Sequence, residues 1–261
     1  MTTSVQEHPG APETVIEFRD VEYNSNGREI LCALNLAINR GEILVLLGRS
    51  GSGKTTALKL VNRLLTLSRG EIRVDGKDVK DWDVIKLRRH IGYAIQDVGL
   101  FPHYTVERNI GLILSLERWD KEKIHARVQE LLRLAGLNPD LASRYPNQLS
   151  GGQRQRVGVA RALAADPPIL LMDEPFGALD PLTRADLQHE FLSLQRKLQK
   201  TVLFVTHDLH EALRLGSRIA LLESGKLVAV GSPEEFLSSS DPLVKKYVEA
   251  FGSIEESRGR K

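Results

Sequence analysis

The chain has 261 residues, 41% of them hydrophobic and 27% charged, which suits one large globular domain or two closely joined lobes. Its formal net charge of +2 gives no electrostatic reason to expect nucleic acid as the main ligand, and the single cysteine, Cys32, excludes an internal disulfide. No stretch approaches the roughly 18 apolar residues of a membrane span, and residues 1–13 form a flexible polar tail rather than a secretory signal, so we expect a soluble cytoplasmic protein.

Two kinds of hydrophobic pattern predict two kinds of β-sheet. Near the N-terminus apolar residues alternate, so that Leu34, Leu36 and Ile38 share one face, as in an antiparallel sheet with one wet side. The later segments around Ile43 and Val202 are continuous apolar runs, which are typical of parallel strands with helices over both faces. The expected strands are 15–19, 34–38, 43–47, 71–74, 91–95, 169–172, 201–206, 219–222 and 227–230.

A glycine-rich segment directly after the strand at 43–47 predicts a nucleotide triphosphate site. Glycines allow a tight turn that points N–H groups at phosphate oxygens, and the N-terminus of the helix that follows adds its partial positive charge. Lys54 can then reach the β- and γ-phosphates, while the Thr55 hydroxyl ligates Mg²⁺. An accidental turn with a surface lysine is disfavoured by the strand before it and the helix after it. The segment consists of Gly48, Arg49, Ser50, Gly51, Ser52, Gly53, Lys54, Thr55 and Thr56.

Polar residues also follow two other predicted strands. Gln96 comes after the strand at 91–95 and can offer an amide oxygen to Mg²⁺ and a hydrogen bond to an attacking water, but a lone glutamine carries no signal by itself. His207 follows the strand at 201–206 and can hydrogen-bond a γ-phosphate or a carboxylate-bound water. Its alternative role is to cap a helix near Asp208. The surrounding motifs decide between these interpretations.

The hydrophobic period changes to a helical one between residues 106 and 165. Ile124, Val128 and Leu131 fall at helical spacing with charged residues between them. We expect residues of about 97–162 to form a helical lobe inserted into the α/β lobe.

Within that lobe, a serine and two glycines precede a further helix and predict a second anion-binding helix N-terminus. The donors are the Ser150 hydroxyl and the backbone N–H groups of Gly151, Gly152 and Gln153. One chain has no obvious need for two phosphate sites, whereas two chains arranged head to tail need both.

The apolar strand at 169–172 ends in two carboxylates, where open α/β sheets place their ligands. Asp173 is suited to hold Mg²⁺, directly or through water, and Glu174 to act as general base or to position the attacking water. Alone, such a pair can be only a solvated turn. The phosphate loop in the same chain favours the functional interpretation because the two parts complete one chemistry.

These motifs occur in the order of the ATP-binding cassette (ABC) family, and residues 14–252 resemble its ATPase subunit. The resemblance implies an α/β P-loop NTPase fold with a RecA-like parallel-sheet core, an antiparallel β-subdomain and the inserted helical subdomain. A flexible tail is then expected at 253–261. ATP and Mg²⁺ are the implied cofactors, with Thr55, Gln96 and Asp173 at the metal.

The resemblance also implies how the catalytic residues are used. Glu174, His207, Gln96 and Lys54 are the implied catalytic set, and Asp180 in the segment after the second carboxylate belongs to the nucleotide-binding residues. Two chains sandwich two ATP molecules, so that the phosphate loop of one faces the residues around Ser150 of the other. ATP closes this dimer, and hydrolysis with product release reopens it.

One position departs from the family pattern. Many members place an aromatic ring against adenine about four residues after a valine equivalent to Val21, where this chain has Ser25. Tyr23 lies two residues earlier, where strand alternation gives it a different face. Either a remodelled loop lets Tyr23 stack on the base, or adenine is held more weakly.

The region after Gln96 narrows the choice within the family. Residues 96–103 resemble bacterial importers, notably the osmoprotectant group for glycine betaine and choline, and 156–168 and 172–181 are similar to importers in general. The resemblance implies transmembrane permease subunits, a second ATPase subunit (a copy or a paralogue) and, indirectly, an external solute-binding protein. It places the chain peripherally on the cytoplasmic face of the inner membrane.

The remaining expectations concern coupling and the competing functions. Leu100 and Phe101 are the expected anchors for a cytoplasmic helix of a membrane subunit, unless they pack the core of their own lobe. Many glycine betaine importers carry regulatory domains after the cassette, whereas this sequence stops at Lys261, so we expect no ionic-strength sensor of that kind. The alternatives are an exporter or lipid transporter with separate membrane subunits, and a soluble ABC ATPase in DNA repair or translation.

Overall fold

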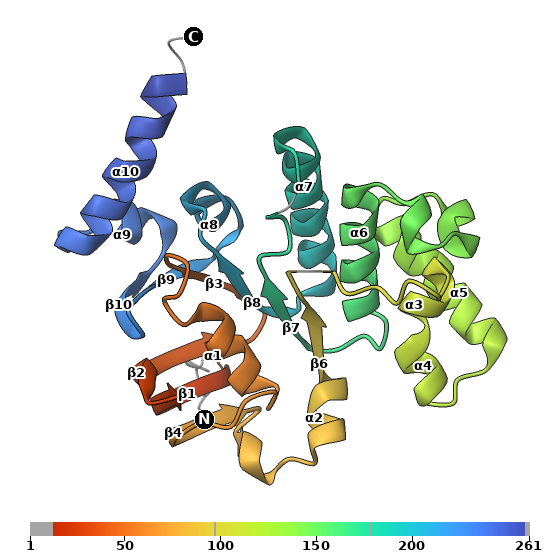
Figure 1. Ribbon diagram of the computed structural model, residues 1–261, viewed down its shortest axis with the longest axis horizontal. Helices are drawn as coiled ribbons and strands as arrows, with labels where there is room; N and C mark the ends of the chain where they lie inside the picture. The colour runs from red at the N-terminus through yellow and green to blue at the C-terminus, as the bar shows by residue number, and fades with distance from the viewer. Residues whose placement is uncertain (1–12, 97, 178, 259–261) are drawn as a thin grey trace, which may run out of the picture.

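The computed structural model describes residues 13–96, 98–177 and 179–258, which fold around two β-sheets (Figure 1). The expected tail at 1–13 lies almost entirely outside these ranges, as does the end of the expected tail at 253–261. The backbone is helical as far as Arg258, beyond the point where we expected the domain to end. Within the described ranges, no helix combines the length and the apolar character that a bilayer crossing requires.

The larger sheet carries the continuous apolar strands. Among the described residues it has six strands in the order β10-β9-β3-β8-β7-β6, parallel except where β10 pairs with β9. Every residue of β3, β7 and β8 is buried, as the sequence predicted for strands covered on both faces. The bounds are β3 Ile43–Leu47, β6 Ile91–Ala94, β7 Ile169–Asp173, β8 Thr201–Thr206, β9 Arg218–Glu223 and β10 Lys226–Gly231.

The smaller sheet is antiparallel throughout its described strands, in the order β2-β1-β4-β5. Its strands are β1 Thr14–Ser25, β2 Arg28–Asn39, β4 Arg69–Val74 and β5 Lys77–Asp78. The alternation that predicted this sheet is visible in β2, where Leu34, Leu36 and Ile38 are buried and point to one core. We did not expect β5, because two residues are too short to show a period.

Helix α1 (Lys54–Val61) lies between the two sheets and joins them into one core (Figure 1). Its buried face packs on β2 and β4 on one side and on β7 and β8 on the other. The opposite face of the parallel sheet is covered by α6 (Gly151–Ala162), α7 (Pro181–Leu198) and α8 (Leu209–Leu215). The start of α1 is therefore fixed at the edge where β3 ends.

The chain between β6 and β7 is helical and extends to one end of the molecule (Figure 1). This arrangement of a parallel core, an antiparallel sheet and an inserted helical part confirms the fold class expected from the sequence. The remaining elements are η1 Val79–Asp81, α2 Val84–His90, α3 Val106–Ile110, α4 Leu112–Leu116, α5 Lys121–Leu134, η2 Pro139–Ser143, η3 Pro146–Gln148, α9 Pro233–Leu237 and α10 Pro242–Arg258.

Candidate functional site

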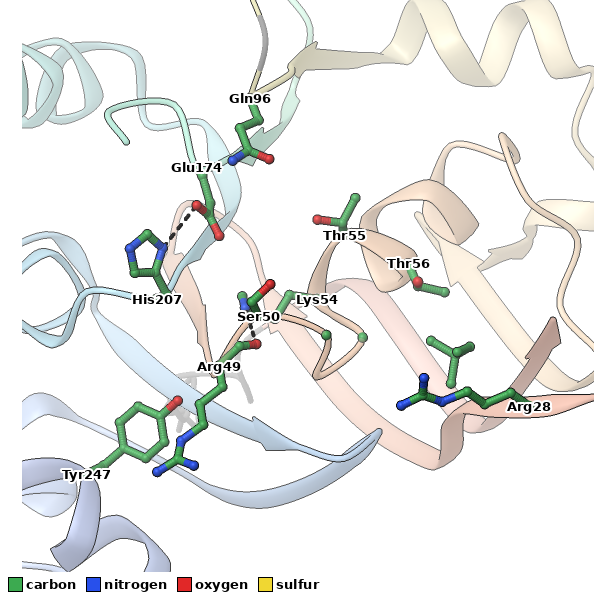
Figure 2. Close-up of a pocket in the computed structure, with 13 residues that line it drawn as sticks. Arg28, Arg49, Ser50, Lys54, Thr55, Thr56, Gln96, Glu174, His207 and Tyr247 are labelled. Atoms are coloured by element: carbon green, nitrogen blue, oxygen red, sulfur yellow. Dashed lines mark hydrogen bonds and ion pairs between the residues drawn. The ribbon is translucent and has the colours of Figure 1, made fainter. Parts of the chain in front are cut away.

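A cavity of 730 Å³ opens where the parallel strands β3, β7 and β8 end (Figure 2). Loops that follow parallel strands meet at one edge of such a sheet, which is where ligands bind in this class of fold. The sequence predicted many of the lining residues, namely Arg49, Ser50, Gly51, Gly53, Lys54, Thr55, Thr56, Gln96, Glu174 and His207. Arg28, Ile30 and Tyr247 also line the cavity and were not predicted.

The glycine-rich loop forms the floor of this cavity. It packs closely on the strands beneath it, because two of its glycines have no room for a side chain. A Cβ on Gly48 would lie 2.3 Å from the Leu222 carbonyl oxygen. Gly53 has φ 105° and would place a Cβ 2.7 Å from the Leu31 side chain. Ser52 is buried beneath the loop with its hydroxyl unpartnered within the described structure. The loop is thus held tightly against β2 and β9, and no side chain caps the first N–H groups of α1.

Lys54 begins α1, and its amine lies inside the loop. Its Nζ donates to the carbonyl oxygens of Gly48 at 2.7 Å and Arg49 at 2.8 Å. Burial lowers the pKa of the amine, and the nearby carboxylates of Glu174 and Asp173 oppose that shift. The cradle therefore combines a partly desolvated cation with an uncapped helix N-terminus, which is a site suited to phosphate oxygens.

A hydroxyl and a carboxylate meet next to the cradle. Thr55 Oγ1 donates to Asp173 Oδ1 at 2.9 Å, and Tyr93 Oη lies 3.5 Å from Asp173 Oδ2. Burial raises the pKa of Asp173; the hydrogen bond from Thr55 opposes this, while the charge of Glu174 adds to it. Hydroxyl and carboxylate oxygens are the donors that Mg²⁺ prefers, so this pair fits the expected metal, and a bound cation would relieve the crowded negative charge. Sequence reasoning missed Tyr93, which orients Asp173 from the neighbouring strand.

Glu174 and His207 form the opposite wall of the cavity (Figure 2). His207 Nδ1 lies 3.0 Å from Glu174 Oε2, and the backbone of Glu174 adopts a positive φ of 45° while its N–H donates to the Val205 carbonyl. Non-glycine residues rarely adopt this region of backbone conformation. Its presence at Glu174 marks a side chain that is held in a required direction. Asp208 accepts from the N–H groups of His210 and Glu211 and so supplies the helix cap that was the alternative role for His207.

Gln96 is exposed and lies above Glu174 at the mouth of the cavity (Figure 2). It follows β6, so the four strand ends at β3, β6, β7 and β8 all contribute to one site. An amide here can turn toward a metal or a water between the Thr55 side and the Glu174 side.

The serine–glycine motif lies elsewhere in the chain, at the start of α6. Ser150 and Gln153 form a capping box, in which Ser150 Oγ accepts from Gln153 N and Gln153 Oε1 accepts from Ser150 N. Ser150, Gly152 and Gln153 line a second cavity of 490 Å³, which shares no lining residue with the first. Gly151 stands between them at the first turn of the helix.

Asp180 caps α7 next to this second cavity. Its Oδ1 accepts from the N–H of Thr183 at 3.0 Å, and the hydrogen bonds from Thr183 lower the pKa of the carboxyl. Thr183 itself lines the second cavity, and a Cβ on Gly152 would lie 2.8 Å from the Thr183 methyl group. Within one chain, the structure therefore brings Asp180 to the serine–glycine motif and not to the phosphate loop.

Tyr23 does not line the first cavity. It pairs with Leu31 on β2 and packs against the core between the two sheets, and its role as an adenine contact stays a prediction. Arg28 and Ile30 reach the cavity instead, because the turn at Asn26 and Gly27, with φ of 50° and 76°, folds β2 back toward the loop. That Asn-Gly pair is a hairpin signal from which this approach could have been anticipated.

Comparison with known proteins agrees with this geometry. Residues 31–177 match the ABC transporter family. The chain belongs to that family. It is 50% identical to the glycine betaine/carnitine/choline transport ATP-binding protein OpuCA of Bacillus subtilis, over 86% of this chain and 58% of that protein. It is also 50% identical to the glycine betaine uptake system ATP-binding protein YehX of Escherichia coli, over 86% of this chain and 73% of that protein.

The fold matches a solved structure as well, the dimeric post-hydrolysis state of the ATP-binding cassette MJ0796 bound to ADP and Pi. The two share 35% identity with a TM-score of 0.76, covering 84% of this chain and 98% of that one. The family and the fold expected from the sequence are thereby confirmed. ATP and Mg²⁺ are the cofactors of this family, and the cradle and the Thr55–Asp173 pair fit both.

Proposed function

We propose that this chain is the ATP-hydrolysing, energy-coupling subunit of an ABC importer for osmoprotectants, quaternary amines such as glycine betaine. The observation that carries the ATPase part is the Glu174–His207 pair, which faces the Lys54 cradle across one cavity. The import part and the substrate are supported by the names of the relatives, which are glycine betaine and choline transport proteins. Because this chain spans only 58% of OpuCA, the activity of the whole protein is part of the proposal.

The residues divide the chemical work by their positions. Bound MgATP supplies a γ-phosphorus open to attack by water and a cation that neutralises phosphate charge. Lys54 exchanges its two loop carbonyl partners for phosphate oxygens, and Thr55 and Asp173 hold the metal side. Glu174 accepts a hydrogen bond, and then the proton, from the attacking water. His207 keeps the Glu174 carboxylate turned into the cavity, and Gln96 orients the water from above.

A second ATPase subunit completes the site in this proposal. The cradle and the Ser150 motif line separate cavities on one chain, so each provides half of a phosphate site. Two chains arranged head to tail bring the α6 N-terminus of one chain to the cradle of the other. ATP then stabilises the closed dimer, and hydrolysis with product release reopens it. The second chain is a copy of this one or a paralogue.

The membrane partner is proposed to dock on the segment that follows Gln96. Phe101 exposes 40% of its surface, whereas Leu100 is partly buried and packs on the core. The fully buried Asn109 fixes this loop, accepting from the N–H of Phe101 at 2.8 Å and donating to the carbonyls of Phe101, Tyr104 and Thr105. A rigid loop with an exposed aromatic ring is suited to receive a cytoplasmic helix of a transmembrane permease subunit.

The proposed location follows from that partner. The chain sits peripherally on the cytoplasmic face of the inner membrane, and an external solute-binding protein delivers the cargo to the permease. Asp97, at the start of the proposed docking segment, lies outside the described residues.

The test is to purify tagged Glu174→Gln protein with MgATP from detergent-solubilised membranes of the source organism and to identify its partners by mass spectrometry. A multi-span subunit encoded beside a solute-binding protein supports the importer. A multi-span subunit without a solute-binding protein supports an exporter or lipid transporter. Recovery with only soluble proteins or nucleic acid overturns the transport proposal and favours a soluble ABC ATPase.

A further inference from the structure

Helix α10 contributes a side chain to the nucleotide cavity from the far end of the described chain. Tyr247 lines the same cavity as Lys54, Glu174 and His207, although it belongs to none of the motifs that predicted the site (Figure 2). Tyr247 therefore reaches the phosphate-loop region from outside the motifs.

The packing of α10 fixes where Tyr247 lies. Val244, one turn earlier, is fully buried in the core that covers the parallel sheet, and Tyr247 and Val248 pack against the same core. The helix contacts α8, α9 and β10, and α8 begins directly after His207 and Asp208. The apolar ring of Tyr247 is therefore anchored, and its polar end is at the cavity.

Tyr247 lies beside Arg49, the second residue of the phosphate loop, and both line the cavity. The two side chains lie together below His207 in Figure 2, and the charge of the Arg49 guanidinium acts on the Tyr247 hydroxyl. The backbone carbonyl of the same Arg49 accepts from Lys54 Nζ at 2.8 Å. Arg49 thus links the C-terminal helix to the lysine of the cradle through one residue.

The surroundings keep this contact between a cation and a neutral phenol. Burial and the nearby Glu223 carboxylate raise the pKa of Tyr247, while the Arg49 charge opposes the shift. A neutral phenol accepts from a guanidinium and still has its own O–H to donate. The exposed Arg49 side chain has many rotamers, and a partner of this kind selects one of them.

We propose that Tyr247 is a positioning residue of the nucleotide site, which holds the Arg49 guanidinium at the mouth of the phosphate loop so that the affinity for MgATP depends on the Tyr247 hydroxyl. The proposal rests on the proposed ATPase function. It makes Tyr247 a further determinant of the affinity for a triphosphate, because loss of its hydroxyl frees the Arg49 side chain. The serine–glycine motif and the hydrolytic pair take no part in it.

The test is a double-mutant cycle on the full chain. We would titrate wild type, Tyr247→Phe, Arg49→Ala and the double variant with the nonhydrolysable MgAMP-PNP by calorimetry, and measure KM and kcat for MgATP alongside. Tyr247→Phe removes the hydroxyl and keeps the ring. It is expected to weaken MgAMP-PNP binding about three- to tenfold, the loss of one polar contact with a cation that is partly exposed to water. The fall in kcat/KM should come from a higher KM for MgATP, with kcat unchanged.

The matched control is Val248→Ala, the next residue of the same helix, which packs on the core and does not line the cavity. It should lower Tm and leave the affinity for MgAMP-PNP unchanged, whereas Tyr247→Phe should weaken that affinity and leave Tm nearly unchanged. The double variant should bind no more weakly than Arg49→Ala alone, because the two residues act as one unit.

Three results would overturn the proposal. Wild-type affinity in Tyr247→Phe would show that the hydroxyl has no role. Losses that multiply in the double variant would show that Tyr247 does not act through Arg49. An equal loss of affinity in Val248→Ala would reduce the effect to helix packing. Failure of the wild-type chain to bind MgATP at all is a separate outcome, and it would overturn the ATPase function together with this inference.

Discussion

Asn109→Leu offers a sharp test of the link between the helical segment and a membrane partner. The substitution keeps the shape of the side chain but removes its hydrogen bonds to Phe101, Tyr104 and Thr105. The side chain is fully buried, so water cannot replace its polar end, while the partly buried loop groups can recover some hydration. We expect the free energy of unfolding to fall by about 2–4 kcal/mol, the cost of leaving buried polar groups unpaired.

The assay is urea denaturation of the purified chain, followed by co-purification of the variant with the proposed membrane subunit. A loosened loop should weaken assembly even where the chain remains folded. The matched control is Glu107→Ala on the same helix, whose hydrogen bond with His125 is exposed and should contribute little. A loss of stability below about 0.5 kcal/mol in Asn109→Leu, or normal assembly with a measurably loosened loop, would refute the reasoning.

Three further predictions concern the phosphate cradle, the docking loop and the residue that contacts adenine. Lys54→Ala should abolish MgATP binding, measured by calorimetry, because the partly desolvated cation inside the loop is lost; retained binding would contradict the cradle. Phe101→Asp should leave the ATPase activity of the chain intact while transport and assembly in membrane vesicles fail, and intact transport would remove the docking proposal. Tyr23→Ala should weaken ATP binding if its ring stacks on adenine. Unchanged ATP affinity in Tyr23→Ala, together with weaker ATP binding in Arg28→Ala, would assign the adenine contact to Arg28.

The sequence carried much of this structure because its strongest signals are local. The buried strands β3 and β8 have the bounds that their apolar runs predicted, and the glycine-rich loop lies between β3 and α1 as expected. The cavity residues that sequence reasoning missed are brought there by packing over long distances. Tyr247 arrives through the anchoring of α10, and Tyr93 through the pairing of β6 with β7. Neither position has a local pattern that distinguishes it from an ordinary core or surface tyrosine.

The two separate cavities show more clearly what sequence order could not predict. Sequence order places Ser150 and Asp173 only a short distance apart, yet Ser150 lines the second cavity with Thr183, and Asp173 contacts Thr55 beside the first. The direction of α6, which begins directly after Ser150 and leads into β7, decides this, and that direction depends on how the helices pack. The motif alone could suggest only that two phosphate sites need two chains.

The most direct test of the central claim is the rate of phosphate release by wild type and Glu174→Gln, each isolated in complex with the proposed membrane subunit and saturated with MgATP. Glu174 faces the cradle in a held backbone conformation, so loss of its carboxylate should remove the proton acceptor and leave binding intact. We predict a fall in the rate of at least about 100-fold with MgATP still bound at normal affinity. Turnover close to that of wild type in the Glu174→Gln complex would contradict the assignment of this cavity as the hydrolytic site.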